Sequence, residues 1–276
     1  MASEKEALSI EKIKQELEAA SPSRRRRAFE KFSLAAIGSI PWIGGFISAG
    51  ISLKTEEGGL RQDSLQTQWL EQHCQKIQDL TMTMNDVGER FEALGDSIDE
   101  RVQSDEYLQL VQKAFRSWDH ADTVQKRMYI RNLVVNSAGA RICDDDVVRL
   151  FIQWLDSYHE SHFLVIREIF RNPNITRAAI WENIHGGYVR DDSAEADLFK
   201  LVVRDLSTGG VIRQLRQTNR MGQFIRAKKP PRKHKGDTLE TPFEDTKPYV
   251  LTEMGKQFVH YTMTDVVTQI EGSSDG

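Results

Sequence analysis

The feature that most constrains the fold of this chain is a run of 22 uncharged residues from Phe32 to Leu53. Folded as one helix, the run would be about 33 Å long, which matches the hydrocarbon core of a bilayer. Cations precede it at Arg24–Arg27 and acids follow it at Glu56–Glu57, an asymmetry that predicts a cytoplasmic N-terminus. Pro41, four glycines and four serines make the run only modestly apolar. Two interpretations therefore stay open, a membrane segment and a hairpin buried in a protein core.

In the membrane interpretation, which we favour, the large side chains of this run contact lipid. These residues are Phe32, Leu34, Ile37, Ile40, Pro41, Trp42, Ile43, Phe46, Ile47, Ile51 and Leu53. The whole chain has a mean hydropathy of -0.50 and 28% charged residues, which excludes a polytopic membrane protein but allows one short span per subunit. Its 39% hydrophobic residues are enough to supply a core. Any pore would then have to be assembled from several copies.

A heptad pattern in residues 70–101 supplies a means of assembly. One apolar seam repeats every seven residues, and a second follows three residues later and is apolar at its middle three positions. The candidate oligomerisation residues are Leu70, Ile77, Leu80, Met84, Val87, Phe91, Leu94 and Ile98. Seven-residue spacing held over five positions is typical of a coiled coil. The alternative is an amphipathic helix that packs on the bundle of its own chain.

Further helices are predicted after this stalk, at about 105–118 and 122–139 and from 144 to about 170. The last of them starts at Asp144–Asp146, and carboxylates at a helix N-terminus offset the helix dipole. The acidic triplet therefore has a structural explanation. Two cysteines are too few for a disulfide framework or a zinc site, which favours a reducing compartment.

The last 100 or so residues resemble a winged helix-turn-helix domain. Short helices at 177–184 and 194–206 precede a strand at 211–213, a long loop, a second strand at 249–251 and a final helix from 252 to about 267. The sequence YVLTEMG, Tyr249–Gly255, is similar to the second wing strand and final helix of such domains. The resemblance implies an α+β C-terminal domain, in a mainly α protein, that binds DNA or docks on another protein.

The loop of this domain is strongly basic, with nine Lys or Arg and no acid from position 213 to 236. The candidate nucleic-acid-binding residues are Arg213, Arg216, Arg220, Phe224, Arg226, Lys228, Lys229, Arg232, Lys233 and Lys235. Such cations neutralise phosphates and release counterions, and an aromatic ring can stack on an exposed base. The alternative is a solvated flexible loop. The helix at 194–206 carries three acids against two cations, which makes it a poor reader of the major groove.

No catalytic constellation stands out. His159 and His162 lie three positions apart rather than the four of HExxH, and on a charged amphipathic helix we expect them at the surface. Walker A, GxSxG and GxGxxG sequences are absent. We therefore predict no catalytic residue, no metal site and no cofactor.

The order of a basic cluster, a glycine-rich apolar segment, a helical stalk and a winged helix resembles the small bacterial membrane effectors of anti-phage defence of the Hailong type. The residues that carry the resemblance are Arg24–Arg27, Phe32–Leu53 and the basic loop. It implies a channel-like effector in the bacterial inner membrane. Its cytoplasmic C-terminal domain would sense an oligonucleotide, such as single-stranded DNA made by a partner nucleotidyltransferase.

We therefore expect a homo-oligomeric, non-catalytic pore that a nucleic acid or another polyanion regulates. Its predicted segments are a charged N-terminal helix at 1–31, an apolar membrane segment at 32–53, a helical oligomerisation region at 54–143 and a winged-helix domain at 144–276. The rival hypotheses are a soluble, cytoplasmic DNA-binding regulator, in which the apolar run is core, and a protein-docking adaptor.

Overall fold

The protein is mainly helical, as the sequence predicts. The computed structural model describes residues 26–43, 59–187, 189–216, 219–221, 223, 241–243, 245 and 247–263, and for 26, 27 and 59–74 it describes the backbone alone. The chain divides into two compact units. Unit 1 comprises residues 1–156 and 261–276, and unit 2 comprises residues 157–260.

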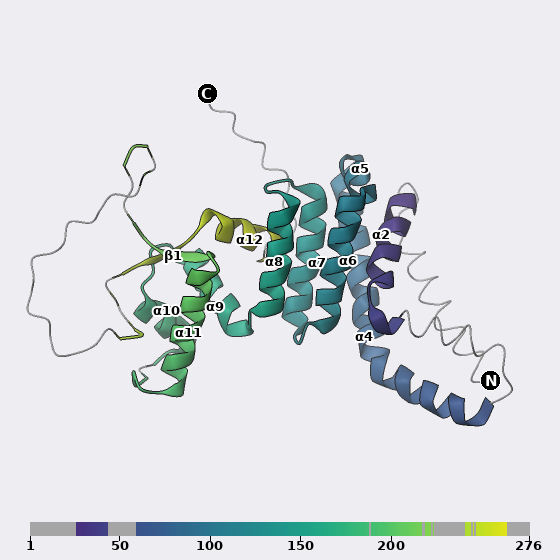
Figure 1. Ribbon diagram of the computed structural model, residues 1–276, viewed down its shortest axis with the longest axis horizontal. Helices are drawn as coiled ribbons and strands as arrows, with labels where there is room; N and C mark the ends of the chain where they lie inside the picture. Colours follow the sequence, from purple (N-terminus) through teal and green to yellow (C-terminus); the bar gives the residue numbers. More distant parts are fainter. Residues whose placement is uncertain are drawn as a thin grey trace, which may run out of the picture. The chain divides into compact units, whose positions relative to one another are not determined.

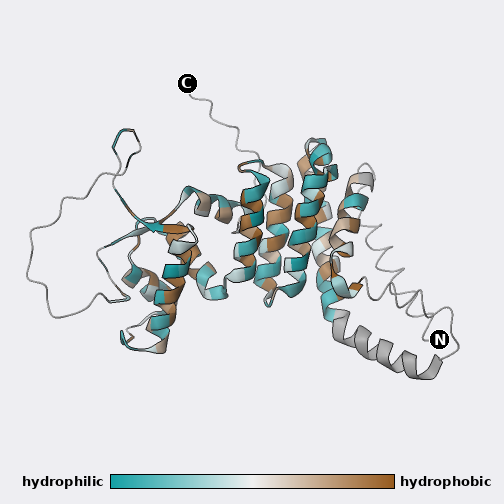
Figure 2. Cartoon of the chain, in the orientation of Figure 1, coloured by the Kyte–Doolittle hydropathy of each residue, from teal (hydrophilic) through white to brown (hydrophobic). Residues whose placement is uncertain are grey.

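Unit 1 is a bundle of helices (Figure 1). Its elements are α2 (Arg26–Gly38), α4 (Gly59–Leu94), the 3-10 helix η1 (Gly95–Ile98), α5 (Asp99–Gln103), α6 (Asp105–His120), α7 (Val124–Gly139) and α8 (Asp145–Ser157), together with the end of α12 (Glu253–Met263). Helix α6 packs between α2 and α7, and α4 packs on α7. Helices α6 and α8 each bury an apolar face, and hydrophobic and hydrophilic residues recur along both ribbons in Figure 2.

Local signals in the sequence set the ends of the bundle helices. The Ser104 hydroxyl accepts a hydrogen bond from the Tyr107 amide at the start of α6, and Thr123 does the same for the Lys126 amide at the start of α7. Such caps satisfy amides that have no partner inside the helix. Gly95 adopts a left-handed backbone (φ 75°) directly after α4, which ends the long heptad helix at Leu94. The predicted helices at about 105–118 and 122–139 are confirmed as α6 and α7.

The start of the apolar run is part of this bundle, and the prediction of a continuous membrane segment is wrong for the part described. Helix α2 ends at Gly38, and the Ser39 hydroxyl donates to the Ala36 carbonyl at the break. Phe32, Ala36 and Ile40 are fully buried, and α2 packs on α5 and α6. The Trp42 indole N–H donates to Asp119 of α6 at 2.7 Å. This part of the run forms protein core.

Small residues on α2 suit this close packing. Ala28, Ala35 and Ala36 lie on the buried face of α2, where small side chains let two helices approach. Ile37, Trp42 and Ile43 are partly exposed, and Leu34 and Pro41 are exposed. The remaining members of the predicted membrane set lie outside the described residues: Phe46, Ile47, Ile51 and Leu53.

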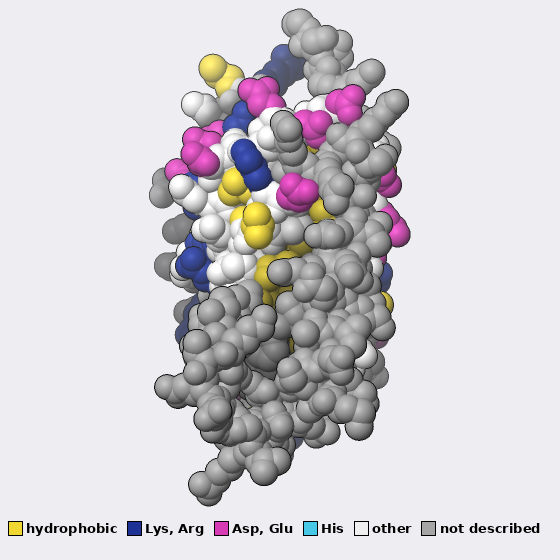
Figure 3. Space-filling view, turned by 90° about the vertical axis from the view of Figure 1, so that its right-hand side faces the viewer, with side chains coloured by type: hydrophobic (Ala, Val, Ile, Leu, Met, Phe, Trp, Pro, Cys, Tyr) yellow, Lys and Arg dark blue, Asp and Glu magenta, His cyan; other side chains and the backbone are white. Residues whose placement is uncertain are grey.

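No helix in the described parts of the chain is both long enough and apolar enough to span a bilayer. This finding corrects the expectation of a transmembrane ion channel and of a location in the inner membrane. Figure 3 shows unit 1 from the side at the right of Figure 1: described hydrophobic side chains lie there among charged ones, beside residues that are not described.

The heptad residues form a buried seam inside unit 1. Leu80, Met84, Val87 and Phe91 on α4 are at most 5% exposed, as is Ile98 on η1. Ile77 and Leu94 are partly exposed, and the side chain of Leu70 lies outside the described residues. Over positions 80–98, the apolar face is therefore already covered by the chain's own helices, which is the alternative arrangement that the sequence left open.

Unit 2 consists of three helices, a two-stranded sheet and most of α12. The elements are α9 (Glu160–Arg171), α10 (Arg177–His185), α11 (Ala194–Thr208), β1 (Ile212–Gln214) and β2 (Tyr249–Leu251). The strands pair antiparallel, and a single bridge joins Ile175 to Tyr249 on the other edge of β2. Thr176 and Ser193 cap α10 and α11, which begin where the sequence predicts the two short helices.

The YVLTEMG sequence joins the sheet to α12. Leu251 is buried and pairs with Ile212 in the antiparallel register. The Thr252 hydroxyl donates to the Gly210 carbonyl at 2.6 Å and accepts from the Gly255 amide at 2.9 Å. A Cβ at Gly255 would lie 2.1 Å from the Val211 carbonyl oxygen, so only glycine fits where α12 passes that backbone. Thr252 thus has a capping role and Gly255 a packing role.

The predicted helix from 144 to 170 is wrong in one respect, because it is two helices. The chain leaves the helical conformation after Ser157, and His159, in an extended conformation, caps α9. The unit boundary falls at the same point, so residues up to 156 group with unit 1. Phe151 and Trp154 of α8 explain this grouping, since both are buried there and Phe151 contacts the ring of Tyr261.

Candidate binding sites

The pairing of β1 with β2 closes a long loop in unit 2. Gln214 lies opposite Tyr249, and the Leu215 amide donates to the Pro248 carbonyl at 2.8 Å, so the two ends of the segment 215–248 are adjacent. Three of the predicted nucleic-acid-binding residues are described, and all are exposed: Arg213 on β1, and Arg216 and Arg220 after it. The other members of the set lie outside the described residues: Phe224, Arg226, Lys228, Lys229, Arg232, Lys233 and Lys235.

Helix α11 presents an exposed face of mixed charge beside this sheet in unit 2. Glu195 and Asp197 lie in its first turn, and Lys200 and Arg204 follow along the helix. The N-terminal residues of a recognition helix normally approach base edges between two phosphate backbones, where carboxylates are repelled. Leu198 (53% exposed) and Leu201 (39% exposed), one helical turn apart, give the same face an apolar patch. We call the exposed residues 195–204 the α11 face.

The expected surface position of His162 is wrong. Its side chain is buried in unit 2, where the ring stacks on Tyr158 with centroids 4.9 Å apart and an interplanar angle of 7°. The Nδ1 atom of His162 accepts a hydrogen bond from the His159 amide. The other ring nitrogen, Nε2, lies 3.9 Å from Oδ2 of Asp205. His162 therefore helps to cap α9. The three-residue spacing of His159 and His162 is that of a capping box, and this spacing could have indicated a helix start at this point in the sequence.

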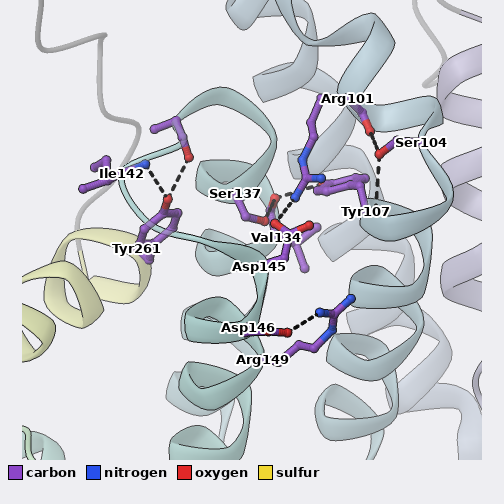
Figure 4. Close-up of polar contacts among 11 residues, drawn as sticks. Arg101, Ser104, Tyr107, Val134, Ser137, Ile142, Asp145, Asp146, Arg149 and Tyr261 are labelled. Carbon is purple, nitrogen blue, oxygen red and sulfur yellow. Dashed lines mark hydrogen bonds and ion pairs between the residues drawn. The ribbon is translucent and has the colours of Figure 1, made fainter. Parts of the chain in front are cut away.

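The acidic triplet is structural, as the sequence predicts. Asp145 forms an ion pair with Arg101, and Asp146 pairs with Arg149 one turn along α8 at 2.8 Å (Figure 4). The Arg101 guanidinium also lies over the ring of Tyr107, 5.1 Å from its centroid. These contacts fasten the start of α8 to α5 and α6.

Two tyrosines and a cysteine near this cluster carry pKa values above their usual range. Burial raises the pKa of Tyr107, whose hydroxyl donates to the Val134 carbonyl at 2.9 Å. The Tyr261 hydroxyl donates to the Ala140 carbonyl at 2.7 Å and accepts from the Ile142 amide at 3.0 Å, and burial raises its pKa to about 12 (Figure 4). Burial also raises the pKa of Cys143, so its thiol is a poor nucleophile at neutral pH.

A cationic pocket of about 300 Å³ lies in unit 1 where α6 ends and α7 begins. Lys113, Arg116 and His120 line one side of it, and Lys126 of α7 and Asp156 of α8 also face it. Sequence reasoning missed this site. The spacing of the first three residues, i, i+3 and i+7, places them on one face of a helix, but a solvated charged face has the same spacing.

Comparison of the chain with protein-family models, with curated proteins and with solved structures found no match.

Proposed function

We propose that the protein is a non-catalytic nucleic-acid-binding protein, and that unit 2 is a module of the winged-helix type. In this proposal the loop between β1 and β2 contacts the phosphate backbone. The observation that carries it is the antiparallel register, Gln214 opposite Tyr249, because it gathers the loop cations on one hairpin of a small domain. The order of three helices, strand, loop, strand and helix supports the winged-helix assignment.

The charges favour the loop over the α11 face as the nucleic-acid contact. The loop has nine cations and no acid from 213 to 236, whereas the α11 face places Glu195 and Asp197 in its first turn. Each neutralised phosphate gives a slope of about -0.7 to -0.9 in the logarithm of the affinity against the logarithm of salt concentration. Four engaged cations would thus lower the affinity about 50- to 150-fold between 50 and 200 mM salt.

Fluorescence anisotropy with single- and double-stranded oligonucleotides over a salt series tests the proposal. The loop variant is Lys228→Glu with Lys229→Glu, and the matched control is Lys200→Glu with Arg204→Glu on the α11 face, which changes the charge equally. We expect the loop variant to weaken binding and to make the salt slope less negative by about 1.4 to 1.8, as for two lost contacts. The control should bind nearly as well as the unmodified chain.

Two results would contradict this function. One is the absence of salt-dependent binding to either oligonucleotide at 50 mM salt. The other is a loss confined to the control variant, which would transfer the contact from the loop to α11. Circular dichroism of both variants distinguishes lost contacts from lost folding.

A protein-docking adaptor is the second candidate, and the apolar patch Leu198 and Leu201 favours it. Exposed leucines surrounded by charges are typical of protein contacts rather than of phosphate contacts. Leu198→Asp with Leu201→Asp should then leave oligonucleotide binding unchanged. A large loss of affinity in this variant would instead assign the helix to the nucleic acid.

A further inference from the structure

We propose that the cationic pocket of unit 1 binds the phosphoryl group of a small phosphorylated molecule. The site lies in unit 1, on α6, α7 and α8, and does not involve the loop to which nucleic-acid binding is assigned above. Its lining, its charge and one buried lysine carry the inference.

Three cations face the pocket against a single carboxylate, that of Asp156, with His120 counted as neutral. Within the described parts of the chain, the Lys113 ammonium donates to the Arg149 carbonyl alone, at 3.3 Å. Among the described residues, no carboxylate pairs with Lys113 or with the exposed Arg116. Two cations that converge on one hollow without carboxylate partners attract a dianion, and phosphoryl oxygens accept hydrogen bonds from both side-chain types.

Lys126 strengthens the positive field from the floor of the pocket. Its side chain is 7% exposed, and its one carboxylate partner is Asp122 at 3.0 Å, a side chain that is 61% exposed. Lys126 also lies in the first turn of α7, which has no acidic residue there. The N-terminal end of a helix is already positive, so the buried ammonium adds to that field, and the carboxylate that balances it is itself mostly in water. The C-terminal ends of α6 and α8 and the Asp156 carboxylate offset this field only in part.

The size and the apolar lining indicate an organic ligand rather than a bare anion. About 300 Å³ is at the lower end of the range of small-molecule pockets and is much more than a phosphate ion fills. Ala121, Ile130 and Leu155 supply apolar surface next to the cations. Asp156 can accept a hydrogen bond from a hydroxyl group of the same ligand. These features together fit a phosphorylated metabolite of about the size of a mononucleotide.

Isothermal titration calorimetry of the full chain with AMP, with adenosine and with inorganic phosphate tests the inference. The variant is Arg116→Glu, because this exposed side chain makes no hydrogen bond or ion pair with another described residue that the substitution would remove. The matched control is Arg141→Glu, which is also exposed and lies beyond the C-terminal end of α7, about 20 Å along that helix from Lys126. Both variants change the charge equally and lie in the same unit.

We expect AMP to bind, inorganic phosphate to compete with it and adenosine not to bind. Arg116→Glu should lower the affinity for AMP tenfold or more, and Arg141→Glu should leave it unchanged. The loop variant Lys228→Glu with Lys229→Glu should also bind AMP normally, which separates this inference from the function proposed above. Equal binding of adenosine and AMP, equal effects of the two arginine variants, or no binding of AMP and phosphate at millimolar concentration would each overturn it.

Discussion

Replacing Phe32 by alanine tests directly whether the apolar run enters the helical core. The ring is fully buried in unit 1. It meets Phe91 and Phe115 edge-to-face, with centroids 5.2 and 5.9 Å away, and stacks near Phe29 at 5.9 Å. Helix α2 is thus joined to α4 and α6 by one aromatic cluster.

The cluster sets the size of the expected loss. Truncation of a buried phenylalanine to alanine costs about 3 to 5 kcal/mol of stability. That total includes about 0.5 to 1.5 kcal/mol for each well-oriented aromatic pair, beyond what burial of apolar area contributes. Since α2 can also detach from the bundle, the loss cannot exceed the free energy with which α2 packs. We therefore expect Phe32→Ala to lower the free energy of unfolding of unit 1 by about 3 kcal/mol.

Urea unfolding followed by tryptophan fluorescence measures this difference, because Trp118 and Trp154 are buried in unit 1. Leu34→Ala is the matched control: it is on the same helix and also becomes alanine, but its side chain is 74% exposed. We expect it to change the free energy of unfolding by less than about 0.5 kcal/mol. If both variants unfold at the urea midpoint of the unmodified chain, α2 is not packed in the bundle and the burial argument fails.

Two further predictions follow from buried side chains of unit 1. Met84→Ala, in the heptad seam, should cost about 2 to 5 kcal/mol of stability and leave the molar mass by light scattering unchanged, since Met84 is buried by its own chain; a lower mass would show that the seam joins copies. Tyr261 has a folded pKa of about 12 against 10.0 in the unfolded chain, so its contribution to stability is present below pH 10 and is lost as the pH rises toward 12. Tyr261→Phe should cost about 1 to 3 kcal/mol at neutral pH, through its lost hydrogen bonds, and should reduce the alkaline fall in the urea midpoint; an identical fall would contradict the pKa assignment.

Capping and turn signals in the sequence predicted much of the fold. Ser104, Thr176 and Ser193 cap helices that begin at the predicted positions 105, 177 and 194, and the strand at 249–251 has the predicted bounds. These signals are local: a hydroxyl that accepts from an amide three residues on depends on few other contacts. They therefore need no knowledge of the rest of the chain.

The incorrect expectations, a membrane segment and a seam between chains, both concern what an apolar helix face packs against. The local sequence pattern does not contain that information. The heptad at Met84 and Phe91 is the same whether the face meets another chain or α7, and here the chain's own helices cover it. The run from Phe32 has the length of a membrane span, yet its Gly38–Ser39 break and its alanines allow a short helix to pack on α6. Length and lack of charge are necessary for a span, but they are not sufficient.

The pocket was missed for a related reason, because its residues come from three helices. Only the fold brings Lys126 and Asp156 to the face of α6 that carries Lys113 and Arg116. In sequence these residues look like ordinary members of charged helices. Burial of Lys126, rather than its identity, is what distinguishes the site from a solvated surface.

The distribution of charge bears on how the two proposed sites would work. The chain has a formal charge of -4, and without the nine loop cations the rest holds 28 Lys and Arg against 41 Asp and Glu, a charge of -13. That acidic remainder repels nucleic acid at long range, so attraction would be confined to distances within about a Debye length of the loop, roughly 8 to 10 Å at physiological salt. Binding should therefore depend steeply on a few loop cations instead of on the general charge of the protein. The same repulsion has little effect on the pocket in unit 1, because a small ligand carries only one or two negative charges and meets the pocket cations at close range. We therefore expect the loop variant to leave ligand binding in the pocket unchanged, and Arg116→Glu to leave nucleic-acid binding unchanged.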